Sequence, residues 1–387
     1  MPELAELIAA ELPDLINIRH DLHRHPELAF NEARTSGVVQ EQLAQLGIQH
    51  KAGLAKGTGV LGFLPATGVA RQTVALRADM DALPILENTG CEYASQTPGK
   101  MHACGHDGHT TVLLGAARVL SKLEERPNNV LFVFQPAEED GGGGQFMVQE
   151  GVLNGSVLGP KADVIFGLHG YPGMTVGGVG TRTGPMMAAT DMFKIVVRGR
   201  GGHAAMPHTG VDPILMASHL VVALQSISSR NVSPLDSVVC TVAMFHSGTA
   251  TNIIPDTVEL QGTIRTLRAE TRSFAEQRLR SITENLSQAF GGSAEITFTN
   301  GYPVTSNDAA AADRFRATVE NLQPDVEPTM GAEDFSYYGL EIPACFFWLG
   351  LVPPGQTSYP NLHAPEFDFN DAAIPVGVKA MCQLALS

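Results

Sequence analysis

The sequence predicts an α/β fold in which a largely parallel sheet carries helices and is interrupted by an inserted ferredoxin-like domain. Apolar, strand-like runs alternate with amphipathic helical segments in both terminal parts of the chain. Those runs are continuously apolar, as strands buried on both faces of a parallel sheet are. The middle of the chain instead follows the order βαββαβ, which is typical of ferredoxin-like domains.

The first part of the chain begins with two amphipathic helices, over residues 4–25 and 33–46, the second ending before Gly47. Strands and helices then alternate. We expect strands at 59–65, 73–77, 129–134 and 163–168, a helix after His109, and a short helix at 144–150. A glycine-rich stretch, residues 173–184, breaks this pattern, and we interpret it as a crossing between domains.

The inserted domain is predicted from six elements: strand 192–198, helix 212–228, strands 237–245 and 256–266, helix 270–290, and strand 294–299. The α/β pattern then resumes with helix 309–322, strand 343–349 and helix 371–386. We therefore expect a discontinuous domain of residues 1–184 and 301–387, with residues 185–300 as the insertion.

Composition narrows the class of protein. The chain has 387 residues and a net charge of −15, which argues against nucleic acid or an anionic membrane as a partner. It has no apolar run long enough to span a bilayer and no basic, apolar leader at its start. Its five cysteines are scattered, so they do not form a disulfide framework. We expect a cytoplasmic location.

The stretch from Met101 to Thr111 concentrates one thiol, three imidazoles and a carboxylate, and it reads as a loop feeding a helix. Other potential metal ligands follow predicted strands or lie in loops. The full candidate set is Cys104, His106, Glu139, His169 and His363. Five ligands exceed one tetrahedral site, so we expect two divalent metals that share Cys104. Zinc or manganese fits these donors best, and nickel or cobalt also fits.

Glu138 stands beside Glu139, after a buried strand and a proline. One carboxylate of such a pair can bind metal while the other accepts a proton from water. A solvated helix start is the alternative interpretation. In a chain that also carries Cys104 and His106, we predict that Glu138 is a general base.

Eight ordered motifs resemble the M20 metallopeptidase family. They are Arg77-Ala-Asp-Met-Asp-Ala-Leu-Pro84, Met101-His-Ala-Cys-Gly-His-Asp107, Pro136-Ala-Glu-Glu139, Gly167-Leu-His169, Gly201-Gly-His-Ala-Ala-Met-Pro-His208, Thr251-Asn-Ile-Ile-Pro-Asp256, Gly331-Ala-Glu-Asp-Phe335 and Leu362-His-Ala-Pro365. The branch that they resemble contains hippurate hydrolases, N-acyl-amino-acid amidohydrolases and auxin-conjugate hydrolases. The resemblance covers nearly the whole chain.

The resemblance implies an enzyme that hydrolyses the amide bond of N-acyl-L-amino acids with two bound metals. It implies the five ligands above, with Glu138 as base, in a catalytic domain. It also implies that the inserted domain is a lid that dimerises, giving a homodimer or a dimer of dimers. His203 would reach the partner subunit's active site and stabilise the oxyanion, and Asn252 and Arg265 would hold the substrate's carboxylate.

One departure from the family pattern concerns the early ligands, because Asp79-Met-Asp81 stands where many M20 peptidases have His-x-Asp. Asp81 either orients a ligand or is a structural aspartate. We favour a site role for Glu333 over a helix cap, and we expect neither His109 nor His208 to be a ligand.

Three alternative functions stay open at this point. A thiol hydrolase would use Cys104 as its nucleophile and ignore chelators. A dipeptidase or carboxypeptidase of the same family would cleave peptides. A non-catalytic protein would bind metal without turnover, although a carboxylate beside the ligands argues against a closed structural site.

Overall fold

The chain is described by a computed structural model over residues 2–323 and 326–387, and it divides into two compact units. Unit 1 comprises residues 1–184, 306–327 and 334–387, and unit 2 comprises residues 185–305 and 328–333. The short segment Pro328–Glu333 thus belongs to unit 2, although the sequence analysis assigned it to the discontinuous domain. Glu333 therefore belongs to a different unit from Asp334, which follows it.

Unit 1 is built on a seven-stranded sheet in the order β1-β2-β4-β3-β5-β15-β6. The pairings among β4, β3, β5 and β15 are parallel, and the outer pairings are antiparallel. The predicted α/β fold with a largely parallel sheet is confirmed. The strands are β1 (Gln49–Leu54), β2 (Gly59–Leu64), β3 (Thr73–Asp79), β4 (Asn129–Gln135), β5 (Val164–Thr175), β6 (Val179–Gly180) and β15 (Ala344–Val352).

Two predictions for this sheet were wrong in detail. β5 continues past His169 into the glycine-rich stretch, because its parallel pairing with β15 extends that far. The stretch also contains β6 and the first residue of β7 (Gly184–Met187). No strand was predicted at β1, because it is an edge strand whose residues alternate between exposed and half-buried up to the buried Leu54 and form no apolar run.

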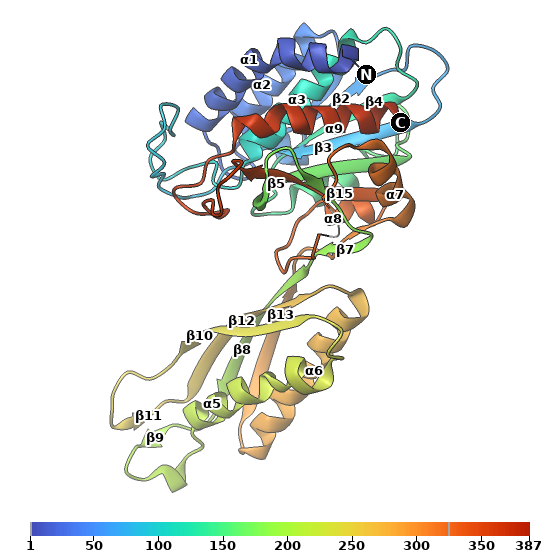
Figure 1. Cartoon of the computed structure of the whole chain (residues 1–387). Coiled ribbons are helices and arrows are strands. Elements are labelled where there is room, and N and C mark those ends of the chain that lie inside the picture. Colours follow the sequence, from blue (N-terminus) through green and yellow to red (C-terminus); the bar gives the residue numbers. More distant parts are fainter. Residues whose placement is uncertain (1, 324–325) are drawn as a thin grey trace. The chain divides into compact units, whose positions relative to one another are not determined.

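Three helices, α1 (Pro2–Arg24), α3 (His106–Lys122) and α9 (Ile374–Leu386), pack together on one face of this sheet (Figure 1). Each contributes side chains to one hydrophobic core, among them Leu15, Val112 and Val378. The other helices of unit 1 are α2 (Ala33–Gln45), α4 (Gly143–Gln149), α7 (Ala309–Thr318) and α8 (Ser336–Gly339), with single turns at Ala55–Gly57 and Asp371–Ala373. Within the described ranges, every helix falls short of the length or apolarity needed to cross a bilayer.

The start of α3 differs from the prediction, which began this helix after His109. Gly105 stands at the N-cap with φ +87°, a left-handed conformation that glycine adopts without steric cost. The chain therefore enters the helix at His106, so His106 and His109 both lie on its first turn. They belong to a rigid element rather than to a loop.

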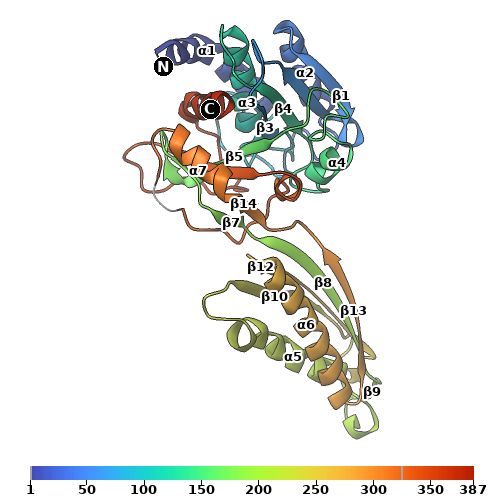
Figure 2. The ribbon, with the colours of Figure 1, turned by 90° about the vertical axis from the view of Figure 1, so that its right-hand side faces the viewer.

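Unit 2 is a four-stranded antiparallel sheet in the order β10-β12-β8-β13, with two helices on one face (Figure 2). Along the chain the elements are β8 (Ala189–Arg198), α5 (Pro213–Leu224), β10 (Val238–His246), β12 (Thr257–Thr266), α6 (Ala269–Ala289) and β13 (Ser293–Asn300). This βαββαβ order confirms the predicted ferredoxin-like insertion. A separate ribbon pairs β9 (Gly202–His203) with β11 (Ile253–Ile254), single turns lie at Pro207–Thr209 and Ile227–Asn231, and β14 (Thr305–Asn307) pairs with β7.

We predict opposite stability effects for alanine at two helical glycines. In α3, a Cβ on Gly108 would lie 2.4 Å from the fully buried ring of Phe369, so Gly108→Ala should lower the unfolding free energy by about 1–3 kcal/mol. In α2, Gly37 has open space around its Cβ position as far as the described residues go, so Gly37→Ala should raise it by about 0.5–1 kcal/mol. Urea denaturation measures both, and equal effects would contradict the packing argument.

Candidate metal centre

The carboxyl ends of two parallel strands bring the acidic motifs together. β3 ends at Asp79 and β4 ends at Gln135, and these residues are directly paired. Asp81 therefore lies beside the loop that carries Glu138 and Glu139. One oxygen of the Asp81 carboxylate accepts a hydrogen bond from Glu138 N, and the other accepts one from Glu139 N, each at 2.9 Å. Asp81 thus holds the backbone of the two glutamates. The sequence had left two interpretations of Asp81 open, a residue that orients a ligand and a structural aspartate.

The five predicted ligands come from separate parts of unit 1 and meet in one place. We call Cys104, His106, Glu139, His169 and His363 the ligand cluster. Ligand atoms of Cys104, His106 and His169 lie within 4.8 Å of one another, and so do those of Cys104, Glu139 and His363. His106, Glu138 and Glu139 form a third such group. Cys104 belongs to two of these groups, which is the arrangement expected of a shared ligand.

An unsatisfied buried nitrogen shows that the cluster fits a cation. His106 Nε2 is buried and has no hydrogen-bond partner among the described residues, whereas His106 Nδ1 lies 3.3 Å from Asp81 Oδ1. His363 Nε2 lies 3.2 Å from Glu139 Oε1, and Cys104 Sγ lies 3.3 Å from His169 Nε2. Buried polar atoms are normally paired, so the unpaired His106 Nε2, among potential metal-ligand atoms that otherwise face one another, indicates a site for a cation.

The tautomer of His169 also suits metal binding. Its Nδ1 lies 2.8 Å from the carbonyl oxygen of Gly170, so Nδ1 carries the proton and donates it. Nε2 then presents a lone pair toward Cys104. Burial, followed by the nearby His109, lowers the pKa of His169 to about 3, which keeps the ring neutral. A neutral imidazole held by its second nitrogen is the usual form of a metal-binding histidine.

Electrostatics in the cluster reflect its excess of carboxylates. Burial and the carboxylates of Glu139 and Glu138 raise the pKa of the Cys104 thiol. Burial alone would lower the pKa of His106, but Asp79 and Asp81 outweigh it and raise that pKa to about 10. A divalent cation would reverse both effects, because it favours a thiolate and a neutral imidazole.

His109 lies beside the cluster but has no nitrogen left for a metal. Its Nδ1 is 2.7 Å from Asp79 Oδ1, and its Nε2 accepts a hydrogen bond from Gly170 N at 2.8 Å. Asp79 in turn pairs with the buried guanidinium of Arg77 at 2.6 Å. The sequence analysis gave Asp79 and Arg77 no role. The signal was present, because two charged residues interrupt an otherwise apolar buried strand.

The remaining predicted site residues all belong to unit 2. His203 and Asn252 lie close together, because β9 pairs with β11 and Ala204 N donates to the carbonyl oxygen of Asn252 at 3.1 Å. Arg265, near the end of β12, donates to the carbonyl oxygen of Met330 at 3.3 Å. Glu333 is buried. His208 lies exposed in the turn Pro207–Thr209.

The first turn of α3 is anchored from behind by a buried ionic network. Asp107, next to His106, accepts from Arg19 Nε at 3.1 Å and from His23 Nδ1 at 2.8 Å. His23 Nε2 lies 3.2 Å from Glu87 Oε1. Burial opposes the charge on His23, but Asp107 outweighs it and raises the pKa of His23 to about 9. The network therefore ties α1 to the helix that carries His106.

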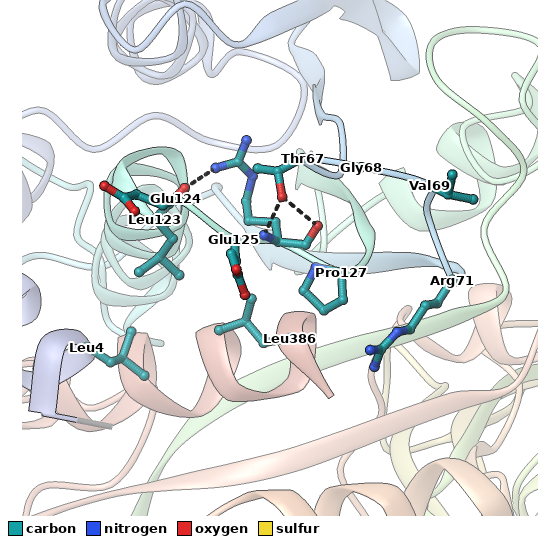
Figure 3. A pocket seen from close by; sticks show the side chains of 11 residues that line it. Leu4, Thr67, Gly68, Val69, Arg71, Leu123, Glu124, Glu125, Pro127 and Leu386 are labelled. Carbon is teal, nitrogen blue, oxygen red and sulfur yellow. Dashed lines mark hydrogen bonds between the residues drawn. The ribbon is translucent and has the colours of Figure 1, made fainter.

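A cavity of about 860 Å³ in unit 1 is lined by residues other than those of the ligand cluster. Residues that line it include Thr67, Arg71, Leu123 and Pro127 (Figure 3). Its described lining contains neither a thiol nor an imidazole.

Comparison with known proteins gives one family. Residues 75–387 match the family model described as Peptidase family M20/M25/M40. The chain is 42% identical over 365 residues to the N-acetyl-L-cysteine deacetylase of Bacillus subtilis (strain 168), covering 93% of this chain and 84% of that protein. It is 40% identical to IAA-amino acid hydrolase ILR1-like 4 of Arabidopsis thaliana, covering 96% and 84%. Among solved structures, the YXEP protein of Bacillus subtilis, described as a dinuclear metal binding peptidase from the M20 family, matches with a TM-score of 0.84 and 33% identity over 98% of each chain.

We predict that His23 makes stability depend on pH. Its folded pKa of about 9 exceeds the unfolded value of 6.5, so protonated His23 stabilises the fold fully below pH 6.5 and loses this effect as the pH rises through 9. The difference in unfolding free energy between the natural chain and His23→Gln should narrow over that range. Urea denaturation at a series of pH values measures it. A difference that stays constant or widens would contradict the assignment.

Proposed function

The chain belongs to peptidase family M20/M25/M40, as its motifs predicted, and from this membership we propose that it is a metal-dependent amidohydrolase that cleaves N-acyl-L-amino acids. The observation that carries the proposal is the ligand cluster, in which thiol, imidazole and carboxylate ligand atoms converge beside Glu138. We assign one divalent cation to His106, His169 and Cys104, and a second to Glu139, His363 and Cys104. Zinc or manganese suits these donors best.

The reaction needs an activated water and a proton carrier. The bound cations would supply Lewis-acid activation of the water and of the acyl carbonyl. Glu138 accepts a proton from the attacking water and then delivers it to the leaving amine, which frees the amino acid and the carboxylic acid. Asp81 contributes by fixing the backbone amide of Glu138, so the base returns to the same position in each cycle.

His203 is suited to stabilising the oxyanion. Its Nδ1 accepts a hydrogen bond from Ala205 N at 3.0 Å, so the neutral ring carries its proton on Nε2. That N–H is a donor available to a developing negative charge. Asn252 lies in the adjacent ribbon, and Arg265 offers a guanidinium that can bind the substrate's carboxylate in bidentate fashion. The guanidinium also supplies the local positive charge that an acidic protein needs to attract an anion.

The spacing within unit 2 supports a homodimer. The β9–β11 ribbon, which contains His203 and begins directly after Asn252, lies at one end of the four-stranded sheet (Figure 1). Arg265 lies near the last residue of β12, the end of that strand farther from the ribbon along the chain. From Thr257 to Arg265 the strand spans roughly 26 Å at about 3.3 Å per residue. One small substrate cannot contact both ends of one sheet, so we propose that His203 acts in the partner subunit's site, in a homodimer or a dimer of dimers.

A thiol hydrolase is the second candidate, and the 3.3 Å approach of Cys104 Sγ to His169 Nε2 favours it, since such pairs activate nucleophilic thiols. The pKa shifts of Cys104 and His169 argue against a thiol hydrolase. Burial and carboxylates raise the pKa of Cys104, and burial lowers the pKa of His169. A thiolate–imidazolium pair is therefore disfavoured in the absence of a cation. Sensitivity to chelators separates the two candidates.

We predict that purified protein hydrolyses a panel of N-acetyl-, N-benzoyl- and N-indoleacetyl-amino acids, and that removing metal abolishes the activity. Glu138→Gln should lower kcat by about 100- to 10,000-fold while the bound metal, measured by elemental analysis, stays unchanged. Full activity after chelation would refute the metal mechanism. Dipeptides and carboxypeptidase substrates in the same panel test the peptidase alternative.

The matched control for Glu138→Gln is Asp140→Asn, an exposed carboxylate two residues along the same loop. It removes the same unit of charge and should leave kcat unchanged. A comparable loss in both variants would mean that the charge of the loop, rather than the base, is responsible.

We also predict that two inactive variants complement each other. His203→Ala removes the oxyanion donor, and Glu138→Gln removes the base. If His203 acts across a two-fold dimer, equal amounts mixed through subunit exchange should recover about a quarter of the natural activity, because half the dimers are mixed and each has one intact site. No recovery in proven mixed dimers would show that His203 acts within its own chain.

A further inference from the structure

A short segment before α2, Glu27–Glu32, contacts both loops that carry the acidic motifs. At its start, Ala82 N donates to the carbonyl oxygen of Glu27 at 2.8 Å, and Leu28 forms a parallel bridge with Ala82. This end holds the strand exit that carries Asp81. At its other end, Glu32 reaches the loop from Pro136 to Gly143. The segment therefore couples the two loops on which the proposed base depends.

The Glu32 side chain is fully buried, and its described hydrogen bonds all stabilise this junction. Its Oε1 accepts from Phe30 N at 3.0 Å and from Ala137 N at 2.9 Å. Its Oε2 accepts from the hydroxyl of Thr58 at 2.8 Å. A carboxylate that accepts this many hydrogen bonds has its position well determined.

The contact at Ala137 matters because the backbone there is strained. Ala137 has φ +55°, a left-handed conformation that is sterically unfavourable for a residue with a Cβ. Such a conformation persists only where its surroundings enforce it. Ala137 N donates to Glu32, and Gly143 N donates to the carbonyl oxygen of Ala137 at 2.9 Å. The strained residue directly precedes Glu138, so its conformation determines where the base points.

Three consecutive amides of this loop thus donate to two buried carboxylates. Ala137 N donates to Glu32, whereas the amides of Glu138 and Glu139 donate to Asp81. Farther along the loop, the Phe30 ring packs against Gly141, where an added Cβ would lie 2.4 Å from a ring carbon. The segment holds the loop at both ends.

We propose that Glu32 is a positioning residue for catalysis: it holds Ala137 in the strained conformation that aims Glu138 and Glu139 at the metal centre. The expected effect of Glu32 on catalysis rests on the proposed amidohydrolase function. The expected effect of Glu32 on metal binding by Glu139 can be measured without any substrate. Glu32 acts through the backbone and does not touch the reacting atoms.

The geometry predicts that two conservative substitutions behave differently. In Glu32→Gln, the remaining oxygen can still accept from Phe30 N and Ala137 N, and the Thr58 hydroxyl can rotate to accept from the new amide. In the natural chain each Asp81 oxygen accepts from its own backbone N–H, and Oδ1 also lies 3.3 Å from His106 Nδ1. In Asp81→Asn the new NH2 group therefore faces another hydrogen-bond donor on whichever side it lies. A side chain of the same shape can therefore replace Glu32, whereas the role of Asp81 requires two hydrogen-bond-accepting oxygens.

The experiment measures kcat, KM, zinc affinity by competition with a chromophoric chelator, and melting temperature for four variants of the full chain. Glu32→Ala should lower kcat and weaken the second zinc equivalent by about 10- to 100-fold each, with KM nearly unchanged. Asp81→Asn should show losses of similar size. Glu32→Gln should restore both quantities to within about threefold of the natural chain.

Thr58→Val is the matched control, because it removes one hydrogen bond from the same carboxylate and leaves the Ala137 contact intact. It should lower the melting temperature without changing kcat or zinc affinity. If Glu32→Ala likewise loses only stability, Glu32 is structural and the proposal is wrong. Glu32→Gln as impaired as Glu32→Ala would also overturn it. If the natural chain shows no chelator-sensitive turnover but Glu32→Ala weakens zinc binding, the proposed function fails and the positioning role stands.

Discussion

Burial of negative charge is the constraint on which the rest of this structure depends. The carboxyl groups of Asp79, Asp81 and Glu138 are all buried inside unit 1. An ionised group removed from water is costly unless a countercharge or a set of hydrogen bonds replaces its hydration. Arg77 and His109 pair with the Asp79 carboxylate. The backbone amides of Glu138 and Glu139 donate hydrogen bonds to the Asp81 carboxylate. The donors left over are those of the ligand cluster, and divalent cations are the partners that match their charge and chemistry.

The parallel sheet explains why these groups can meet. β3, β4 and β5 run in the same direction, so the acidic loops after β3 and β4 emerge at one edge, beside His169 on β5. Strand pairing does not determine the conformation of loops at such an edge, so other contacts must stabilise it. Here buried carboxylates bind their amides, while the anchored N-terminus of α3 supplies His106 from a rigid helix. Preorganisation of this kind keeps ligand positions independent of the bound ion.

Unit 2 has its own hydrophobic core and carries the residues proposed for substrate recognition. Its own core is complete, with Ile195, Leu260 and Leu279 fully buried between the sheet and its helices. The residues proposed for substrate recognition lie at opposite ends of one sheet, which is the basis of the proposed homodimer. Chemistry and recognition are thereby assigned to separate folding units, and each can vary in sequence without disturbing the other's core.

The sequence alone was sufficient to predict the fold class and the family, and it provided the ligand set that we propose. Continuous apolar strands, helical periodicity and the residue types at strand ends are local signals, and Cys104, His106 and Glu139 stand out by chemistry. Tertiary structure decided what no local pattern encodes. Glu32 reads as an ordinary acidic residue before a helix, and only folding brings it to Ala137, 105 positions away. The start of α3 at His106, the protonated nitrogens of His169 and His203, and the separation of Arg265 from His203 likewise depend on contacts between distant segments. Hydrogen-bond partners arise from three-dimensional proximity, which periodicity and composition do not contain.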